Sequence, residues 1–246
     1  MNLTKQTKYT AIVTGSTRGI GKETALLLLK NGINVIVSSR NQDNIDKILQ
    51  EILVEFPSKK DNILGSKCDV SNYSDVKSLV NKSIKRFGKI DILVNNAGIV
   101  YFKSLLDTTE EEWDRTIDIN LKGAFLFTKE VLQYMIENKS GGIIVNVSSG
   151  AGRSGFPNLS SYCASKFGII GITESLAKEV DDSNIKVMAI CPGGVDTKMM
   201  KDVVNQGFDR SNIKLMKPEE VAKKIYDMIF NQKDYYNGQS IELYNK

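Results

Sequence analysis

The sequence predicts a doubly wound α/β fold, in which a parallel sheet of seven strands carries helices on both faces and forms a single domain over residues 1–246. Short apolar or β-branched runs recur along the chain, and segments with the apolar spacing of helices lie between them. This alternation implies βαβ units and therefore parallel strands. Near-continuous apolar runs such as Ile92-Leu93-Val94 suit strands that helices cover on both sides.

The elements follow from these patterns in chain order. The predicted strands occupy residues 10–14, 35–38, 63–68, 90–94, 143–147, 185–190 and 240–243. The predicted helices occupy residues 20–29, 45–56, 76–87, 116–136, 167–180 and 221–230. Gly32 and Gly88 lie where helices should stop, Pro57 follows the second helix, and Pro218 opens the last helix in its first turn. No linker, repeat or low-complexity tract divides the chain.

Composition and charge argue against several classes of protein. Hydrophobic residues make up 41% of the chain and charged residues 25%, which is typical of a protein that buries a core. The formal charge of +4 comes from 33 basic and 29 acidic residues, and no basic stripe indicates nucleic acid or a membrane surface as a partner. No apolar run reaches the length of a signal peptide or a membrane span, so we expect a cytoplasmic protein.

Cysteine and histidine usage narrows the chemistry. Cys68, Cys163 and Cys191 are far apart and lack CxxC spacing, which favours reduced thiols over a disulfide framework. The chain contains no histidine, which excludes a Ser-His-Asp triad, a Cys-His dyad and every zinc site that needs histidine. Any acid or base in a reaction must therefore be another residue type.

A glycine-rich segment joins the first predicted strand to the first predicted helix. Its residues are Gly15, Ser16, Thr17, Arg18, Gly19, Ile20 and Gly21. Glycines let the backbone approach a pyrophosphate closely, and the N-terminus of the helix offers free N–H groups and a positive dipole. The spacing is GxxxGxG rather than GxGxxG, so the segment predicts a dinucleotide site mainly through its place between a strand and a helix.

Further motifs follow this segment in a fixed order. They are Asp69-Val70, Asn95-Asn96-Ala97-Gly98, Tyr162-x-x-x-Lys166 and Pro192-Gly193. Together with the glycine-rich segment, they resemble the signature of the classical short-chain dehydrogenases/reductases over nearly the whole chain. The resemblance implies one Rossmann domain without a separate substrate domain, and the pattern is most similar to 3-oxoacyl-[acyl-carrier-protein] reductases and NADPH carbonyl reductases.

The resemblance implies four catalytic residues: Asn120, Ser149, Tyr162 and Lys166. Tyr162 and Lys166 are four residues apart, so on a helix both project from one face, and the ammonium is expected to lower the pKa of the phenol. The family serine lies thirteen residues before the tyrosine, which selects Ser149 over Ser148. Asn120 is expected to kink its helix and to hold a water that connects Lys166 to solvent. No metal is needed.

The resemblance also implies the cofactor contacts. Besides the glycine-rich segment these are Ser39, Arg40, Asp69, Val70, Asn96, Ala97, Gly98, Tyr162, Lys166, Pro192, Gly193, Val195 and Thr197. Lys166 is expected to bind the nicotinamide ribose, and Thr197 to lie near the carboxamide. The expected cofactor is NADPH/NADP+, because no Asp or Glu ends the second strand and Arg18 and Arg40 could bind a 2′-phosphate.

The reaction implied is hydride transfer between the nicotinamide and a carbonyl or alcohol, with several substrates open. A 3-oxoacyl-thioester reductase ranks first, with an acyl-carrier protein or CoA as carrier and Lys139 and Lys178 as candidate cations. Ketones, diketones or quinones of a carbonyl reductase and the substrate of a hydroxysteroid dehydrogenase remain alternatives, because the segments 100–105, 153–159 and 198–216 vary in this family. A non-catalytic NADPH-sensing protein is a further alternative.

The resemblance also predicts a homotetramer. The faces that pair in the family are those of the predicted 116–136 helix and of the helix beginning near Tyr162, and Leu121, Phe125 and Phe127 are candidate apolar contacts.

Overall fold

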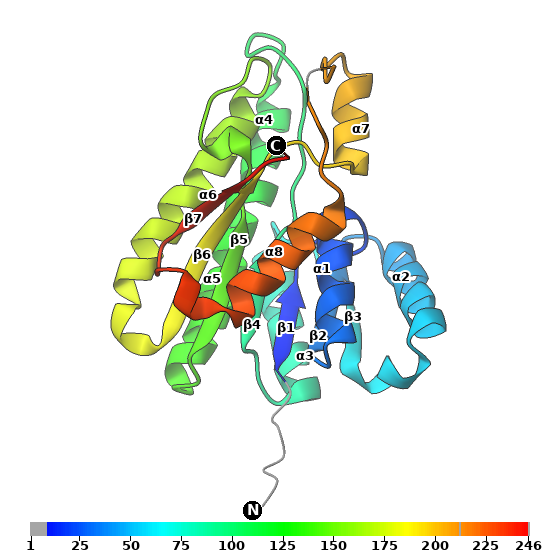
Figure 1. Cartoon of the computed structure of the whole chain (residues 1–246), viewed down its shortest axis with the longest axis vertical. Coiled ribbons are helices and arrows are strands. Elements are labelled where there is room, and N and C mark those ends of the chain that lie inside the picture. Colours follow the sequence, from blue (N-terminus) through cyan, green and yellow to red (C-terminus); the bar gives the residue numbers. More distant parts are fainter. Residues whose placement is uncertain (1–8, 212, 246) are drawn as a thin grey trace, which may run out of the picture.

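The computed structural model describes residues 9–211 and 213–245. Its seven strands form one sheet in the order β3-β2-β1-β4-β5-β6-β7, and every neighbouring pair is parallel. The carboxyl ends of the strands point toward the top of Figure 1. The strands are β1 (Thr10–Val13), β2 (Asn34–Ser39), β3 (Ile63–Lys67), β4 (Ile92–Asn95), β5 (Gly142–Val147), β6 (Ile185–Pro192) and β7 (Ser240–Leu243).

The helices connect the strands and cover both faces of the sheet. They are α1 (Gly19–Lys30), α2 (Gln42–Glu55), α3 (Tyr73–Phe87), α4 (Glu110–Ile117), α5 (Gly123–Glu137), α6 (Ser160–Glu179), α7 (Lys198–Asn205) and α8 (Pro218–Phe230). Short helical turns are η1 (Pro57–Asn62), the π-helical η2 (Asp118–Lys122), η3 (Gly150–Gly152), η4 (Asp181–Ser183) and η5 (Gln232–Asp234). None of the helices in the described part of the chain has the length and hydropathy needed to span a membrane.

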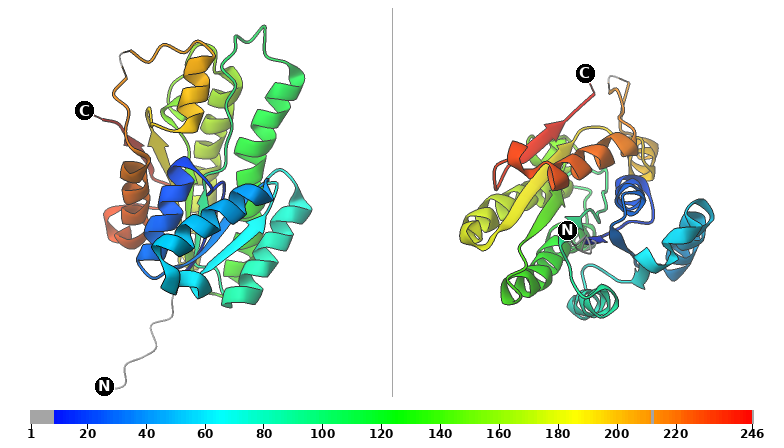
Figure 2. Two further views of the ribbon diagram at one scale, coloured as in Figure 1. Left: turned by 90° about the vertical axis from the view of Figure 1, so that its right-hand side faces the viewer. Right: turned by 60° about the horizontal axis from the view of Figure 1, so that its bottom comes forward.

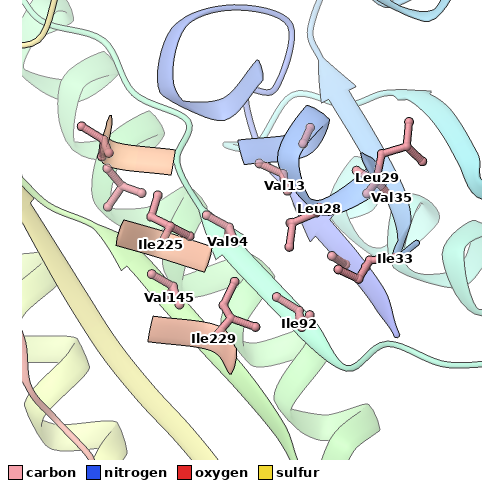
Figure 3. Close-up of a cluster of buried hydrophobic side chains, with 14 of the residues drawn as sticks. Val13, Leu28, Leu29, Ile33, Val35, Ile92, Val94, Val145, Ile225 and Ile229 are labelled. Carbon is pink, nitrogen blue, oxygen red and sulfur yellow. The ribbon is translucent and has the colours of Figure 1, made fainter. Parts of the chain in front are cut away.

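Alternate residues of each strand point to opposite faces, and this divides the core into two layers. Val13 packs with Leu28 of α1 and Ile225 of α8 on one face, where Figure 3 shows part of the cluster. Ile12 packs with Leu79 of α3 and Phe127 of α5 on the other. Figure 2 shows the two helix layers on either side of the sheet. Helices cover both faces of the sheet, which explains why the strands are near-continuous apolar runs in the sequence.

The predicted fold class, a doubly wound parallel sheet of seven strands, is confirmed, and several helix ends obey the expected rules. Gly88 caps α3 with φ 80°, and Pro218 occupies the first turn of α8. Several helices begin earlier than predicted, α6 by seven residues, at Ser160. The predicted 116–136 helix is divided into α4, which begins at Glu110 behind a capping box of Thr109 and Glu112, the turn η2, and α5. Helix α7 was not predicted.

The structure corrects one of the predicted assembly contacts. Phe127 is 0% exposed because it packs into the sheet, so it is not available to another subunit. Phe125, two residues earlier on α5, is 47% exposed. Residues two apart on a helix face different sides, and the sequence pattern did not decide which side met the sheet.

Candidate active site

A cavity of about 640 Å³ lies where the carboxyl ends of the strands meet the loops and α7. Ligands bind at this edge in open parallel sheets. Eighteen predicted site residues line it: Gly15, Thr17, Arg18, Gly19, Ile20, Ser39, Arg40, Val70, Asn96, Ala97, Gly98, Ser149, Tyr162, Lys166, Pro192, Gly193, Val195 and Thr197. Four others, Ser16, Gly21, Asp69 and Asn120, lie outside its lining. The cavity therefore joins the glycine-rich segment to the tyrosine-lysine pair.

The glycine-rich segment folds tightly beneath the cavity. Gly15 and Gly19 have φ values of 63° and 56°, which favour glycine. A Cβ on Gly21 would lie 2.6 Å from the carbonyl oxygen of Gly15, so only glycine fits there. Ser16 is structural, because its hydroxyl donates to Val13 O (2.7 Å) and accepts from Ser38 N (3.0 Å).

The Asn95-Asn96-Ala97-Gly98 motif braces this segment from the next strand. The Asn96 amide donates to Thr14 O (2.9 Å), and the Thr14 hydroxyl accepts from the backbone N–H groups of Asn96 and Ala97 (3.0 Å each). Asn95 is buried and donates to Asn146 and Thr128 inside the core. The motif thus fixes the glycine-rich segment and lines the cavity at the same time.

The cofactor end of the cavity has the charge that a phosphorylated ligand requires. Arg18 precedes α1 and makes no side-chain cap, so the first N–H groups of this helix face the cavity without one. Among the described lining residues, none is Asp or Glu, whereas Arg18, Arg40, Lys166 and Lys198 all contribute. Within the described chain neither Arg18 nor Arg40 has an ion-pair partner.

Two further observations show that a nicotinamide dinucleotide fits. The buried Ser38 hydroxyl at the end of β2 lines the cavity and has no hydrogen-bond partner among the described residues. A Cβ on Gly19 would lie 3.3 Å from Cγ2 of Thr197, so the two loops expected to hold pyrophosphate and carboxamide adjoin. Asp69 instead turns away, and its carboxylate accepts from the N–H (3.0 Å) and hydroxyl (2.6 Å) of Ser71.

Tyr162 and Lys166 lie one turn apart on α6 and both line the cavity. The Lys166 Nζ atom lies 5.6 Å from the centroid of the Tyr162 ring and donates to Val147 O at 2.8 Å. Lys166 is only 4% exposed, so its amino group is held between β5 and the phenol. The predicted pairing of these residues on one helix face agrees with this geometry.

The expected lowering of the Tyr162 pKa is wrong. Burial raises the pKa of Tyr162 to about 12, and the hydrogen bond with Ser149 opposes this only in part. Burial also lowers the pKa of Lys166 to about 8. Desolvation is the largest cause of both shifts, because it disfavours the charged form of each group. The phenol is therefore protonated at neutral pH, which is the form that can give a proton.

The two candidate serines have different partners. Ser149 lies close enough to the Tyr162 phenol to lower its pKa, and its hydroxyl accepts from Ala151 N at 3.2 Å. The Ser148 hydroxyl is buried and donates to the backbone oxygen of Lys166 at 2.9 Å. Ser149 thus faces the phenol, whereas Ser148 fastens α6 to the end of β5.

Asn120 lies in the π-helical turn η2, which interrupts the path from α4 to α5. Its amide donates to Ile99 O (2.9 Å) and to the Ser165 hydroxyl (3.0 Å), and its Oδ1 accepts from Ile99 N (2.8 Å). A Cβ on Gly98 would lie 3.3 Å from this Oδ1 and 3.7 Å from Lys166 Nζ. Asn120 therefore holds the loop after β4 against α6, close to Lys166. Its water-binding role remains a prediction.

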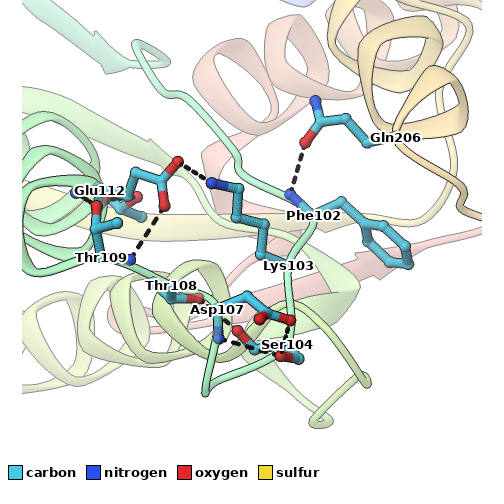
Figure 4. A network of polar contacts seen from close by, with 9 residues as sticks. Phe102, Lys103, Ser104, Asp107, Thr108, Thr109, Glu112 and Gln206 are labelled. Carbon is cyan, nitrogen blue, oxygen red and sulfur yellow. Dashed lines mark hydrogen bonds and ion pairs between the residues drawn. The ribbon is translucent and has the colours of Figure 1, made fainter.

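The other end of the cavity is apolar. The sequence analysis named only the variable segments that form it and no individual lining residues. Its side chains include Val100, Phe156, Leu159, Met199, Met200, Val203, Phe208 and Ile213. The Gln206 amide oxygen accepts from Phe102 N at 3.0 Å, and the rings of Phe102 and Phe208 pack edge-on at 5.4 Å. Figure 4 shows the hydrogen bond between Gln206 and Phe102 beside the Lys103–Glu112 ion pair (2.5 Å). The loop after β4 is thereby fastened to the end of α7.

Sequence reasoning missed Tyr244 and Cys68, both of which line the cavity. Cys68 is buried, and burial raises the pKa of its thiol to about 12. Tyr244 lies just beyond β7, far from every motif. No signal in the sequence identified either residue, since each reaches the cavity only through the strand pairing.

Comparisons with known proteins show the family of the chain. Residues 9–207 match the family model described as short chain dehydrogenase. The chain is 37% identical to a 3-oxoacyl-[acyl-carrier-protein] reductase of Thermotoga maritima, with 94% of each protein covered. It is 36% identical to dehydrogenase/reductase SDR family member 4 of Bos taurus, over 94% of this chain and 84% of that protein.

Solved structures give the same result. Levodione reductase has a TM-score of 0.89 at 28% identity, with 96% of both chains covered. A 3-ketoacyl-(acyl-carrier-protein) reductase from Brucella melitensis complexed with NADH has a TM-score of 0.86 at 30% identity, also with 96% of both chains covered. An actinorhodin polyketide ketoreductase with NADPH has a TM-score of 0.88 at 31% identity, over 96% and 95% of the chains. The chain belongs to the short-chain dehydrogenase family and is an oxidoreductase that acts on CH–OH groups with a nicotinamide cofactor.

Proposed function

We propose that the protein is an NADPH-dependent reductase of carbonyl compounds, with 3-oxoacyl thioesters as the favoured substrates. The observation that carries the proposal is the single cavity that joins the glycine-rich segment to Tyr162, Ser149 and Lys166. One ligand that spans this cavity has its phosphates at the N-terminus of α1 and its reactive end beside the phenol.

The proposed mechanism assigns each polar group one task. When bound, the nicotinamide supplies the hydride. Ser149 donates a hydrogen bond to the carbonyl oxygen, and Tyr162 gives its proton to that oxygen as negative charge develops. Lys166, whose pKa is about 8, carries a positive charge at pH 7 and stabilises the phenolate that remains. The raised pKa keeps the Tyr162 phenol protonated at neutral pH, which is the form that gives a proton in the reduction.

The preference for NADPH rests on Arg18 and Arg40. Both line the cofactor end of the cavity, together with Ser39. Two guanidinium groups and a hydroxyl are suitable donors for a 2′-phosphate, whereas a site for NADH ordinarily places a carboxylate there. The Brucella melitensis relative is complexed with NADH, and kcat/KM with each of the two cofactors measures the preference of this chain.

The substrate class rests on the similarity to 3-oxoacyl-[acyl-carrier-protein] reductases and on the apolar end of the cavity, which suits an acyl chain. The same apolar lining favours a second candidate, a carbonyl reductase of ketones, diketones or quinones. An acyl-carrier protein or CoA would carry the thioester in the first case. The exposed Lys139 and Lys178 are candidate cations for an acyl-carrier protein.

We also propose a single-domain homotetramer located in the cytoplasm. All seven strands form one sheet, and all three cysteines are free. Phe125 on α5 and Phe167 on α6 are each 47% exposed and supply apolar contacts on the helix faces that pair in the family. Light scattering at micromolar concentration tests the assembly, and a monomer would contradict it.

The deciding experiment is an NADPH-oxidation screen of the purified protein. Acetoacetyl-CoA and an acetoacetyl-carrier-protein are compared with diketones, quinones, aldehydes and ketosteroids. We expect the acetoacetyl thioesters to give the highest kcat/KM. A higher value for diketones or quinones would favour the second candidate. Tight NADPH binding without turnover of any carbonyl would indicate a non-catalytic NADPH-binding protein instead.

A further inference from the structure

Tyr244 reaches the active-site cavity from the carboxyl end of the last strand. Leu243 pairs with Pro192 in the sheet, and Gly193 N donates to Leu243 O at 2.9 Å. Tyr244 therefore lies beside the Pro192-Gly193 segment, lines the cavity and is 50% exposed. It has no part in the proton transfer proposed above.

Backbone contacts hold the Tyr244 ring in place. A Cβ on Gly193 would lie 2.5 Å from its Cδ1 atom, and a Cβ on Gly150 would lie 3.0 Å from its hydroxyl oxygen. The ring is thus packed on the backbone of two glycines, and backbone yields less readily than a flexible side chain. Any side chain at either glycine would displace the ring.

Polar contacts reinforce this placement. Burial and the neighbouring Glu242 carboxylate raise the pKa of the Tyr244 phenol, and Glu242 pairs with Arg153 at 3.4 Å. The next residue, Asn245, donates its side-chain amide to Leu215 O at 2.8 Å. The end of the chain is therefore attached to the loop after Ser149 and to the segment that follows α7.

The position of the ring relates it to the reacting carbonyl. Gly150 directly follows Ser149, the proposed donor to the carbonyl oxygen, and Gly193 lies in the segment expected to face the nicotinamide. A rigid aromatic side chain at this junction limits the space beside the carbonyl carbon. Its exposed face is apolar and flat, so it can pack against an unbranched substrate but leaves little room for a branch.

We propose that Tyr244 is a specificity-determining residue that restricts the substrate sterically. Carbonyl substrates with an unbranched carbon next to the reacting carbonyl fit beside its ring, and substrates with a ring or branch at that carbon do not. The inference rests on the carbonyl reduction proposed above and adds a limit on the width of the substrate next to the reacting carbonyl. Linear 3-oxoacyl groups meet this restriction, whereas cyclic 3-oxo esters do not.

The test compares two substrates of the same chemistry and different width. Ethyl acetoacetate is the narrow substrate, and ethyl 2-oxocyclohexanecarboxylate carries a ring at the adjacent carbon. We expect Tyr244→Ala to raise the ratio of kcat/KM for the cyclic over the linear ester at least tenfold, mainly through KM. Tyr244→Phe keeps the ring and should leave the ratio within threefold of wild type. Tyr236→Ala removes an exposed tyrosine outside the cavity and is the matched control.

Two further measurements separate specificity from folding. The melting temperature and the NADPH dissociation constant, measured by fluorescence, are expected to change little in Tyr244→Ala. If the Tyr244→Ala variant does not fold, the Tyr244→Leu variant is used in its place. The pair 2,3-butanedione and camphorquinone serves in the same way if the esters are poor substrates.

Each outcome has a distinct meaning. If a folded Tyr244→Ala or Tyr244→Leu variant still reduces the linear ester and its cyclic-to-linear ratio of kcat/KM is unchanged, Tyr244 does not restrict the substrate. The proposed function is unaffected by that result. A tenfold shift in Tyr244→Phe also overturns the inference about Tyr244, because the ring would not be the cause. If the wild type reduces no carbonyl in either pair or in the screen, the proposed function fails and the inference fails with it.

Discussion

The two ends of the cavity are built in different ways. The cofactor end is built around one contiguous turn, Gly15 to Ile20, with the end of β2 and the segment after β4 beside it. The substrate end combines side chains such as Phe156, Met200, Phe208 and Tyr244 from separate segments. Recognition by backbone N–H groups requires glycines at fixed spacing, so the first end is legible in the sequence. Recognition by apolar bulk can be achieved by many sequences.

The two ends also differ in charge. Arg18 and Arg40 are without ion-pair partners at the cofactor end within the described chain, and no carboxylate among the described residues lines the cavity. At the rim, Lys198 pairs with Asp202 at 2.8 Å. The unpaired cations therefore lie where a phosphate is expected, and the catalytic residues lie between the two ends.

The largest expected effect concerns the catalytic residues, which lie between the two ends of the cavity. Tyr162→Phe should reduce kcat by roughly 10²–10⁴-fold, because it deletes the transferable proton and keeps the ring. The NADPH dissociation constant should stay within a few-fold of wild type, since the cofactor end is unaltered. Steady-state kinetics and cofactor fluorescence measure the two. Tyr134→Phe, which removes a hydroxyl bonded to Gly88 O, is the control. Turnover above a tenth of wild type would remove Tyr162 as the acid.

The neighbouring serines give a sharper division of roles. Ser149→Ala removes the hydroxyl that faces Tyr162, and we expect kcat to fall by about 10²–10³-fold, as for the loss of one donor to a developing oxyanion. Ser148→Ala removes only the bond to the backbone of Lys166, so it should cost far less. The measurement is kcat/KM for both variants on the same substrate. Equal losses would show that Ser149 has no special part in binding the carbonyl oxygen.

Lys166 is one of the proposed catalytic residues, and its burial also affects the free energy of unfolding. Its pKa is lowered from the ordinary 10.5 to about 8 in the folded protein. Between these pH values the unfolded chain binds a proton that the folded chain does not, so the free energy of unfolding rises with pH across this range. Below about pH 8 the buried charge destabilises the fold by roughly 3 kcal/mol.

Lys166→Met should therefore be more stable than wild type at pH 7, by less than this amount because the bond to Val147 O is lost. The difference should shrink as the pH rises toward 10. Urea unfolding at both pH values measures it, with the exposed Lys77→Met as control. A constant difference would mean that Lys166 does not titrate in this range.

The smallest effect concerns the cofactor end alone. We expect at least tenfold higher kcat/KM with NADPH than with NADH, because a charged hydrogen bond contributes roughly 1.5–3 kcal/mol. Arg40→Asp should erase or invert this ratio and leave the KM of the carbonyl substrate unchanged. Lys47→Asp on the outer side of α2 makes the same charge change away from the cavity. Equal efficiencies in the wild type, or a ratio that Arg40→Asp does not alter, would exclude Arg40 as the phosphate contact.

Local features of the fold and site could be predicted because local rules dictate them. The apolar runs determined the seven strands, Gly88 and Pro218 marked helix ends, and the spacing of Tyr162 and Lys166 placed both on one face of a helix. The glycine-rich segment was predicted because its φ values and close contacts tolerate little else. Helix α7 was missed because it is only eight residues long and lies within a segment read as a variable loop.

The sequence by itself determined the succession of strands and helices along the chain and the place of the dinucleotide turn, because each depends on residues within a few positions of one another. It identified the tyrosine-lysine pair through the order of the family motifs along the chain. The tertiary structure decided the direction of the Tyr162 pKa, the partners of Ser148 and the approach of Tyr244 to Gly150 and Gly193. These depend on burial and on pairing between distant strands. Desolvation and packing arise from the whole fold, so no spacing along the chain encodes them.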